Sequence, residues 1–541
     1  MSSESDTATL NQPQWPRIKR ILPHVWLGFI VLSTLIICLC TLNYAHNWGG
    51  DFSAYIMLAR SICQFSTGEF IENNRLTVEQ SSTRVGPVAY PWGFPVMLAP
   101  VYATFGLHLL ALKMVGVLFY LGLLVVMWYE FERFHTPLWR SACVLLFAVN
   151  PTLIGFTNHV LSDIPFLCLS TLAICLMGRI IVEQRVLWTP VKDRMLLGIV
   201  IACAFFVRTN GILLFGVLCW SQLVAMCSFI WRRHKQGASW REATVSLYEK
   251  DSENPQQRIS LFVPYISLGC LILFWKLILP EGGASHFEHL ERVNAESIKG
   301  NSIYYRDLLA NFFSGIPYYK EHKGQWIAYI VTLPFVVIGL IRHIRVSHHM
   351  LIYLLLTYGL FILWPHKQGL RFLFPVLPFY MLFFVSGLSL FAHGSRVWIK
   401  IPTTLVCVLP ILFALFHFGS SSIQQAEMQL RARSTVEHGP FADYSLEMFD
   451  FIQEQAAAED TIVFFKPRVM RLMTNRNTLR INNANDLFVA DYVCFFNNLH
   501  PFHIDHMQVL DQQQRAKINF SNEHYVAYKL HHTVPEVAPK N

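Results

Sequence analysis

About a dozen apolar segments run through the first 420 residues of this chain, and they constrain its fold more than any other feature. A membrane-spanning helix needs roughly 20 predominantly apolar residues, and these segments approach that length. Only 14% of the residues are charged, compared with about 25% in a typical soluble protein. We therefore expect a polytopic α-helical membrane protein. The segments lie at 25–42, 91–107, 114–129, 142–157, 160–178, 195–207, 212–231, 260–279, 326–342, 349–365, 371–392 and 400–418.

Lys and Arg residues beside these segments indicate the orientation of the chain, because short cytoplasmic loops carry an excess of them. Residues 1–24 are accordingly expected to be a cytoplasmic tail, and residues 25–420 a transmembrane module with external loops at 43–90 and 280–325. The same clusters account for the net charge of +8, so no nucleic-acid partner is expected. They lie at 17–20, 179–194, 232–235, 342–345 and 396–400.

The loop at 43–90 and Asp163 are both expected outside, which requires an even number of crossings between them. Three segments lie there, and the first, 91–107, is short and contains three prolines. We expect it to enter the membrane without crossing, since broken backbone is tolerated where protein or a cavity covers it. About eleven crossings then remain, with the N-terminus inside and the C-terminus outside.

Residues 421–541 differ in character from the rest and are expected to form a small external α/β domain. They contain 25 of the 78 charged residues. Residues 445–458 have the periodicity of an amphipathic helix, and 461–465, 491–496 and 525–530 have that of strands. Cys63 and Cys494 are the two cysteines in the predicted external segments, and one disulfide between them is an open alternative.

The first external loop carries the first candidate for chemistry, in the sequence NWGGDFSAY at residues 47–55. Its aspartate, Asp51, stands where a helix would begin, so it either caps that helix or acts in a site. The residues after it, 54–65, alternate as an amphipathic helix with Tyr55 on the apolar side. Such a helix is expected to lie along the membrane surface.

A second carboxylate and several cations are expected on the same side of the membrane. Asp163 stands at the outer end of an apolar segment, where an ionisable residue is a candidate site residue or the cap of a helix. Arg208, Lys367 and Arg371 flank other apolar segments. Their side chains suit phosphate, although long cations at an interface also simply extend to the water. Together these residues fit a substrate that is a phosphate on a lipid.

These residues belong to a series of motifs in a fixed order. The series resembles the GT-C-fold glycosyltransferases that use polyprenyl-phosphate sugars, among them bacterial aminoarabinose (lipid A) transferases and protein O-mannosyltransferases. The resemblance covers residues 25–420, and the tail's FKPR at 465–468 is similar to external domains of bacterial members. The motifs are GGDxxxY at 49–55, YPWGFP at 90–95, NP at 150–151, VLSDxPF at 160–166 and RxxxPxxP at 371–378.

The resemblance implies the transfer of a sugar from a polyprenyl-phosphate donor to an acceptor hydroxyl, with inversion at C1. Asp51 and Asp163 match the acidic positions and would be catalytic, with Asp51 as general base or acceptor orienter. The substrate-binding residues would be Tyr55, Tyr90, Arg208, Lys367 and Arg371. A divalent metal ion held by Asp51 and Asp163 is one option. Because Phe52 replaces a second acid found in many relatives, Asp51 can also act without a metal.

The implied partners are a polyprenyl-phosphate-linked sugar, a lipid, protein or polysaccharide acceptor, and membrane lipid. The implied location is the bacterial cytoplasmic (inner) membrane, with the reaction on its external face. Two other hypotheses remain. A transporter or flippase would also use broken helices and buried charges, but no internal repeat is visible between the halves. A relative that binds lipid-linked glycan without catalysis is the third.

Overall fold

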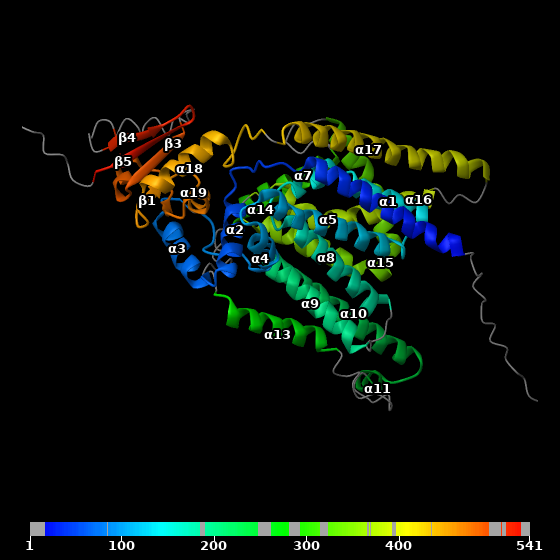
Figure 1. The fold of residues 1–541 in the computed structure, drawn as a ribbon. Coiled ribbons are helices and arrows are strands. Elements are labelled where there is room, and N and C mark those ends of the chain that lie inside the picture. Colours follow the sequence, from blue (N-terminus) through cyan, green and yellow to red (C-terminus); the bar gives the residue numbers. More distant parts are fainter. Residues whose placement is uncertain are drawn as a thin grey trace, which may run out of the picture.

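The computed structural model is mostly helical, with a small sheet near its C-terminal end (Figure 1). It describes residues 17–83, 85–183, 190–246, 261–280, 293–313, 323–364, 367, 369–391, 397–433, 435–496, 510 and 516–531. The expected site residues are all among them, whereas His366 and part of the external loop at 280–325 lie outside the described residues.

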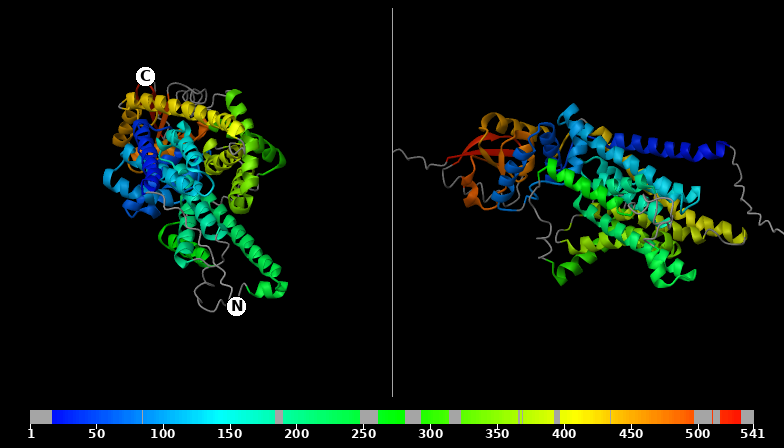
Figure 2. Two further views of the ribbon diagram at one scale, coloured as in Figure 1. Left: turned by 90° about the vertical axis from the view of Figure 1, so that its right-hand side faces the viewer. Right: turned by 90° about the horizontal axis from the view of Figure 1, so that it is seen from below.

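The membrane module is a bundle of long apolar helices, seen side by side in Figures 1 and 2. Among the described residues, six helical segments are long and apolar enough to cross a membrane. A seventh is added if α6 (Pro137–Ala148) and α7 (Pro151–Thr157), which bend by 52°, form one broken span. The long helices are α1 (Arg17–Thr41), α5 (Leu109–Phe131), α8 (Asp163–Met177) with η1 (Gly178–Glu183), α10 (Ile212–Lys235), α15 (Lys323–Leu363) and α16 (Leu377–Phe391), which follows η5 (Leu370–Val376).

Helix α15 passes through the bundle twice, although its 41 residues form one helical range. Near its start, Gln325 Nε2 donates to Asn311 Oδ1 at 3.0 Å. Near its end, Asn301 Nδ2 donates to the carbonyl of Trp364 at 2.8 Å. Residues 301 and 311 lie in and just after one short helix, α14 (Ala295–Ala310), about 15 Å apart along its axis. A straight α15 would separate its two ends by roughly 55 Å, so the helix must fold back.

The fold-back agrees with the two separate segments predicted at 326–342 and 349–365. The middle of α15 lies at the other end of the bundle, where the ring of His343 stands edge-on to Phe134, just beyond the end of α5.

Each of the twelve predicted segments overlaps a helix. Besides the helices given above, the predicted segments overlap α4 (Gly93–Phe105), α9 (Val191–Val207), α13 (Val263–Ile278) and α17 (Val397–Arg431). Helix α4, at 13 residues, is too short to cross, as expected for 91–107.

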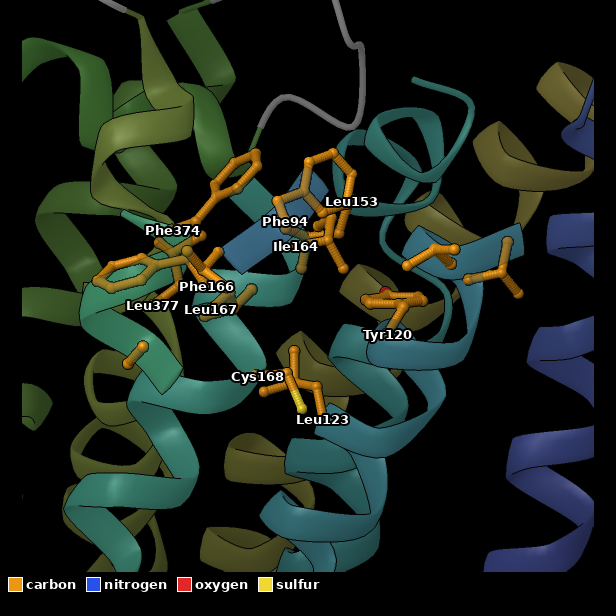
Figure 3. Packing of buried hydrophobic residues seen from close by; sticks show 14 of the residues in the cluster. Phe94, Tyr120, Leu123, Leu153, Ile164, Phe166, Leu167, Cys168, Phe374 and Leu377 are labelled. Carbon is orange, nitrogen blue, oxygen red and sulfur yellow. The ribbon is translucent and has the colours of Figure 1, made fainter. Parts of the chain in front are cut away.

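The helices pack closely where glycines let two backbones approach. A Cβ atom at Gly339 of α15 would lie 1.9 Å from the carbonyl oxygen of Phe383 in α16, and one at Gly387 would lie 1.9 Å from that of Phe335. Small residues bring membrane helices together in this way. Side chains in the first turns of α4, α7 and α8, such as Phe94, Leu153 and Ile164, belong to one continuous apolar core (Figure 3).

The loop at 43–90, which the sequence predicts to be external, contains two helices, α2 (Gly50–Cys63) and α3 (Thr67–Gln80). The amphipathic exposure expected for residues 54–65 is not found, whereas their position along the membrane surface stays a prediction. Residues 52–59 are all buried, because α2 packs against α4 on one side and against α19 (Pro467–Thr474) of the C-terminal domain on the other. An amphipathic pattern does not reveal a second partner from a distant part of the chain.

The C-terminal region folds into the expected α/β domain, with helix α18 (Asp443–Gln455) beside a five-stranded sheet of order β2-β1-β3-β5-β4. Strand β1 is parallel to β2 and β3, and the other pairs are antiparallel. Helix α17 extends to Arg431, beyond the predicted boundary at 420. Cys63 and Cys494 are free thiols rather than a disulfide. The strands are β1 (Thr461–Val463), β2 (Asn477–Leu479), β3 (Tyr492–Phe496), β4 (Ala516–Ser521) and β5 (Tyr525–Leu530).

Short elements complete the described chain. They are η2 (Thr209–Gly211), α11 (Trp240–Val245), η4 (Asn311–Phe313) and η6 (Ala484–Val489).

The C-terminal domain docks on the loop at 43–90 through polar and aromatic contacts. Arg471 Nη1 donates to Thr77 Oγ1 of α3 at 3.1 Å, and Arg60 of α2 donates to Asn475 Oδ1 at 3.0 Å. The ring of Trp48 lies 5.0 Å from that of Phe465. The loop that carries Asp51 is therefore held between the membrane bundle and this domain (Figure 1).

Candidate functional site

Asp51 lies in the first turn of α2, and its carboxylate binds two side chains from other elements. Tyr90 donates its hydroxyl to Oδ1 at 2.7 Å, and Arg371 Nη1 donates to Oδ2 at 3.1 Å. The residue at the N-cap of α2 is Gly49, and no side chain caps the helix. The alternative that Asp51 serves only as a cap is therefore not supported, because its oxygens are committed to residues 39 and 320 positions away.

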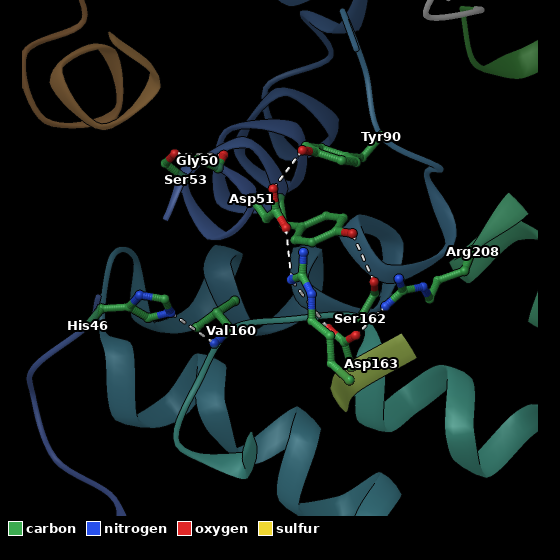
Figure 4. A network of polar contacts seen from close by, with 11 residues as sticks. His46, Gly50, Asp51, Ser53, Tyr90, Val160, Ser162, Asp163 and Arg208 are labelled. Carbon is green, nitrogen blue, oxygen red and sulfur yellow. Dashed lines mark hydrogen bonds and ion pairs between the residues drawn. The ribbon is translucent and has the colours of Figure 1, made fainter. Parts of the chain in front are cut away.

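Arg371 links the two carboxylates predicted from the sequence. Its Nη1 atom lies 3.1 Å from Asp51 and 4.0 Å from Asp163 Oδ2. The other oxygen of Asp163 accepts a hydrogen bond from Arg208. Acidic and basic side chains thus alternate in the order Asp51, Arg371, Asp163, Arg208, with part of this network drawn in Figure 4.

The network sits at one end of the bundle. Asp163 is the first residue of one candidate span, and Arg371 is the second residue of another, Leu370–Phe391. The Asp163 side chain is only 2% exposed, whereas that of Asp51 is 31% exposed. Asp51 is therefore the carboxylate that a ligand can reach, and Asp163 is positioned to hold Arg371 and Arg208 in place.

The environment of Asp51 keeps it ionised. Burial alone would raise the pKa of this carboxyl, but the charge of Arg371 and the hydrogen bond from Tyr90 outweigh burial and hold the pKa below its usual range. Burial and the neighbouring Asp51 charge raise the pKa of Tyr90, so its hydroxyl remains a donor. The arrangement presents a carboxylate that can accept a proton only after its partners release it.

The two carboxylates do not fit a divalent metal ion between them. A bridging ion would need the position that Arg371 Nη1 takes, next to an oxygen of each carboxylate. Hard divalent ions need several oxygen ligands, and no group of three or more His, Cys, Asp or Glu side chains suited to a metal occurs in the described part of the chain. The arginines supply the positive charge here.

Tyr55 and Lys367, the other expected binding residues, lie at the margin of this network. The Tyr55 hydroxyl is 2.8 Å from Ser162 Oγ, and its ring is 5.0 Å from that of Tyr90. Lys367 is exposed, with Nζ 5.1 Å from the ring centre of Tyr304 in α14. Tyr55 thus packs beneath the site, whereas Lys367 is exposed beside α14. Tyr318 and Tyr319, expected in the same loop, lie outside the described residues.

A cavity of about 660 Å³ opens beside Asp51, a volume within the usual range for small-molecule sites. Asp51 and Arg371 line it, whereas Tyr55, Tyr90, Asp163, Arg208 and Lys367 do not. Most of the rest of the wall comes from residues 43–52, residues 152–161 and the C-terminal half of α17, and single residues at 311, 325, 369, 370 and 438 complete it. Most of these lining residues were not predicted, because single Asn, Gln and His residues carry no motif.

His46 is one of the lining residues that the sequence did not reveal. Its Nδ1 lies 3.0 Å from the carbonyl of Asn47, and its Nε2 accepts the amide of Val160 at 3.2 Å. Both ring nitrogens are therefore used, which fixes a neutral ring with the proton on Nδ1. Burial lowers the pKa of His46 well below its usual value. His46 stacks on Phe52 at 3.8 Å and so fixes the loop beside Asp51.

Lys113 holds the same loop from inside the bundle. Its Nζ donates to the carbonyls of Asn43 and Ala45 at 2.8 and 2.7 Å and to Asn158 Oδ1 at 2.9 Å. The side chain is fully buried, and a buried ammonium group requires such partners. Lys113 thereby joins α5 to both cavity walls.

The C-terminal domain also reaches the site. The guanidinium of Arg468 lies 5.3 Å from the ring centre of Tyr90 and donates to the carbonyl of Pro87. Arg468 is 1% exposed, and its charge contributes to the low pKa of Asp51. The FKPR sequence of the tail is thus part of the surroundings of Asp51.

Comparison with known proteins places this geometry in a known architecture. The sequence matches no protein-family model and no curated protein. The structure is similar to that of ArnT, an aminoarabinose lipid A transferase from Cupriavidus metallidurans bound to undecaprenyl phosphate. The TM-score is 0.59 at 11% sequence identity, over 93% of this chain and 98% of that one.

A second similarity is to the archaeal oligosaccharyltransferase AglB from Archaeoglobus fulgidus, in complex with an inhibitory peptide and a dolichol-phosphate. Here the TM-score is 0.52 at 10% identity, over 87% of this chain and 69% of that one. Both proteins have the GT-C fold. The chain described here is therefore a multi-pass membrane protein with the GT-C glycosyltransferase fold, as the order of its motifs suggested.

Proposed function

We propose that this protein is a membrane glycosyltransferase that moves a sugar from a polyprenyl-phosphate donor to an acceptor hydroxyl, with inversion at C1. The observation that carries the proposal is the Asp51 carboxylate, which lies on the wall of a polar cavity and binds Arg371 at 3.1 Å. The donor class is supported by the two similar structures, which contain undecaprenyl phosphate and a dolichol-phosphate.

In the proposed reaction the acceptor hydroxyl attacks C1 of the sugar from the face opposite the phosphate. The bond between C1 and the phosphate oxygen breaks, and its electron pair leaves on the lipid phosphate. The proton of the hydroxyl passes to the Asp51 carboxylate, which acts as general base. Arg371 stabilises the charge that develops on the phosphate, which is an electrostatic contribution to the rate. Arg208 and Lys367 extend the positive surroundings on the same side.

Arg371 can also couple donor binding to the basicity of Asp51. In the free protein this guanidinium holds the Asp51 carboxylate and lowers its pKa. A donor phosphate attracts the same guanidinium. As Arg371 turns toward the phosphate, Asp51 loses its counter-charge and its proton affinity rises. The base then becomes effective only when a donor is present. Asp163, which is buried beside Arg371, limits how far the guanidinium can move.

We further propose that the site lies on the external face of the bacterial cytoplasmic membrane, with the N-terminus inside. This rests on the basic clusters next to the spans and on the position of Asp163 and Arg371 at the first turns of two spans. Acceptors of the proposed reaction are lipids, proteins or polysaccharides that carry a free hydroxyl on that face.

The test uses membranes that contain the wild-type protein or an Asp51→Asn variant, incubated with a panel of radiolabelled polyprenyl-phosphate sugars and an envelope extract. The control is Asp450→Asn, which changes an exposed aspartate of α18. We expect label to leave the lipid with the wild-type and control proteins but not with Asp51→Asn. If no donor loses label to any of the folded proteins, the proposal is wrong, and lipid-flipping assays would then test the transporter hypothesis.

A further inference from the structure

The wall of the cavity beside Asp51 is rich in uncharged polar side chains, which the proposed reaction does not by itself require. Seven of its 22 lining residues are Asn or Gln. Three more are histidines, of which His438 is exposed. The rings of His46 and His159 are buried, and burial lowers the pKa of both, to about 4 for His159. The carboxamides and these two buried rings are uncharged at neutral pH, and carboxamides both donate and accept hydrogen bonds. The wall therefore suits sugar hydroxyls, which also both donate and accept hydrogen bonds.

Charges on the wall are few and already paired. Asp51 is the one carboxylate among the described lining residues, and it is held by Arg371 and Tyr90. Lys113 lies behind the wall and bonds to Asn43 and Asn158, both lining residues. An ammonium group in this cavity would meet no unpaired carboxylate of the described wall and would lie near two cations. An unpaired charge in such a place is costly.

Several polar atoms of the wall have no hydrogen-bond partner among the residues that the structure describes. Thr152 Oγ1, Gln325 Oε1 and Gln425 Oε1 are buried without a hydrogen bond, although buried polar groups are normally satisfied. The three residues come from α7, α15 and α17, and all line the cavity. Two aromatic residues, Phe52 and Phe156, supply apolar surface in the same wall. A ligand rich in hydroxyl groups can satisfy such atoms after small side-chain rotations.

We propose that this cavity binds an uncharged, hydroxyl-rich sugar and discriminates against sugars that carry a free amino or carboxylate group. The inference rests on the proposed function, because it assigns the sugar of that donor. It concerns the substrate class, whereas the proposed function concerns the reaction. In this respect we expect the protein to differ from ArnT, whose sugar is aminoarabinose.

The test measures binding rather than turnover. Purified full-length protein in detergent is mixed with radiolabelled undecaprenyl phosphate, which is then displaced by three donors that share one lipid and phosphate. Their sugars are a neutral hexose, a 4-amino pentose and a uronic acid. We expect the hexose donor to bind at least about tenfold more tightly than either charged donor.

A pair of variants on α17 tests whether the cavity is responsible. Gln425→Glu places a carboxylate in the wall next to Gly155, and we expect it to shift the preference toward the amino sugar. Gln424→Glu makes the same change at the exposed neighbouring residue and should leave the preference unchanged. A wild-type protein that prefers a charged sugar, or a Gln425→Glu variant with an unaltered preference, overturns the inference.

Failure of the proposed function would look different. If all three donors bind no better than undecaprenyl phosphate itself, the cavity is not a sugar site and the inference is wrong, while lipid-phosphate binding remains. If an amino sugar is transferred in an Asp51-dependent way, the reaction stands and the sugar assignment falls. If undecaprenyl phosphate does not bind to the folded protein and no transfer occurs, the proposed function fails and the inference fails with it.

Discussion

Replacing Tyr90 with Phe isolates the effect of one hydrogen bond on the candidate base. The Tyr90 hydroxyl donates to Asp51 Oδ1 at 2.7 Å, and hydrogen bonds to charged groups contribute about 1.5–3 kcal/mol. The bond stabilises the ionised carboxylate, so its loss must raise the pKa of Asp51. Since 1.36 kcal/mol corresponds to one pKa unit, the expected rise is about one to two units. Arg371 remains and keeps part of the original depression of the pKa.

The assay is the pH dependence of kcat/KM for sugar transfer by purified protein. Transfer requires ionised Asp51, so activity falls as the pH drops through the pKa of this carboxyl. In Tyr90→Phe this acidic limb should move to higher pH by about one to two units. Tyr55→Phe is the matched control, because it removes a buried hydroxyl that bonds to Ser162 instead, and its acidic limb should not move.

Two results would refute this reasoning. An acidic limb that stays in place in a folded Tyr90→Phe protein would mean that Asp51 is not the titrating base. An equal movement in Tyr55→Phe would mean that packing around the site, rather than the hydrogen bond, sets the pH dependence.

Two further predictions concern stability and are checked by thermal unfolding in detergent. Gly339→Ala puts a methyl group 1.9 Å from the carbonyl oxygen of Phe383. Overpacking of this kind costs about 1–3 kcal/mol, so the melting temperature should fall. Gly359→Ala on the same helix has open space around it and should not lower the melting temperature. Lys113→Met removes the buried donor to the carbonyl of Asn43. An unsatisfied buried acceptor costs about 1–3 kcal/mol, so the melting temperature should fall. An unchanged melting temperature would contradict the structural role of Lys113.

The sequence predicted the membrane helices well because their signal is local. A run of apolar residues long enough to span a bilayer has few other uses, and each predicted segment overlaps a helix. The fold-back of α15 was also predictable. The basic residues at 342–345 stand between two apolar segments, and by the positive-inside rule such a cluster predicts a turn between two spans. Strands β2 and β4 were not predicted. The three residues of β2, Asn477–Leu479, carry too little periodicity.

The site could be predicted only in part. Asp51 and Arg371 stood out because charged residues are rare beside apolar segments, and the structure brings them into contact across 320 positions. The partner of Asp163 was not predictable, because nothing in the sequence places Arg208 against it. Gln425 lies near the polar end of α17, where a glutamine is an ordinary residue. Its role in the cavity wall depends on how α17 packs against α7, which is a property of the whole fold.

The most direct test of the account is the single-turnover rate of sugar transfer by purified wild-type protein and Asp51→Asn, measured together with the affinity of each for the donor. A positioned general base contributes about 10²–10⁴-fold to a rate. We expect Asp51→Asn to lose at least about 100-fold in rate while it still binds the donor. A folded Asp51→Asn protein that transfers sugar at the wild-type rate would contradict the central role given to Asp51.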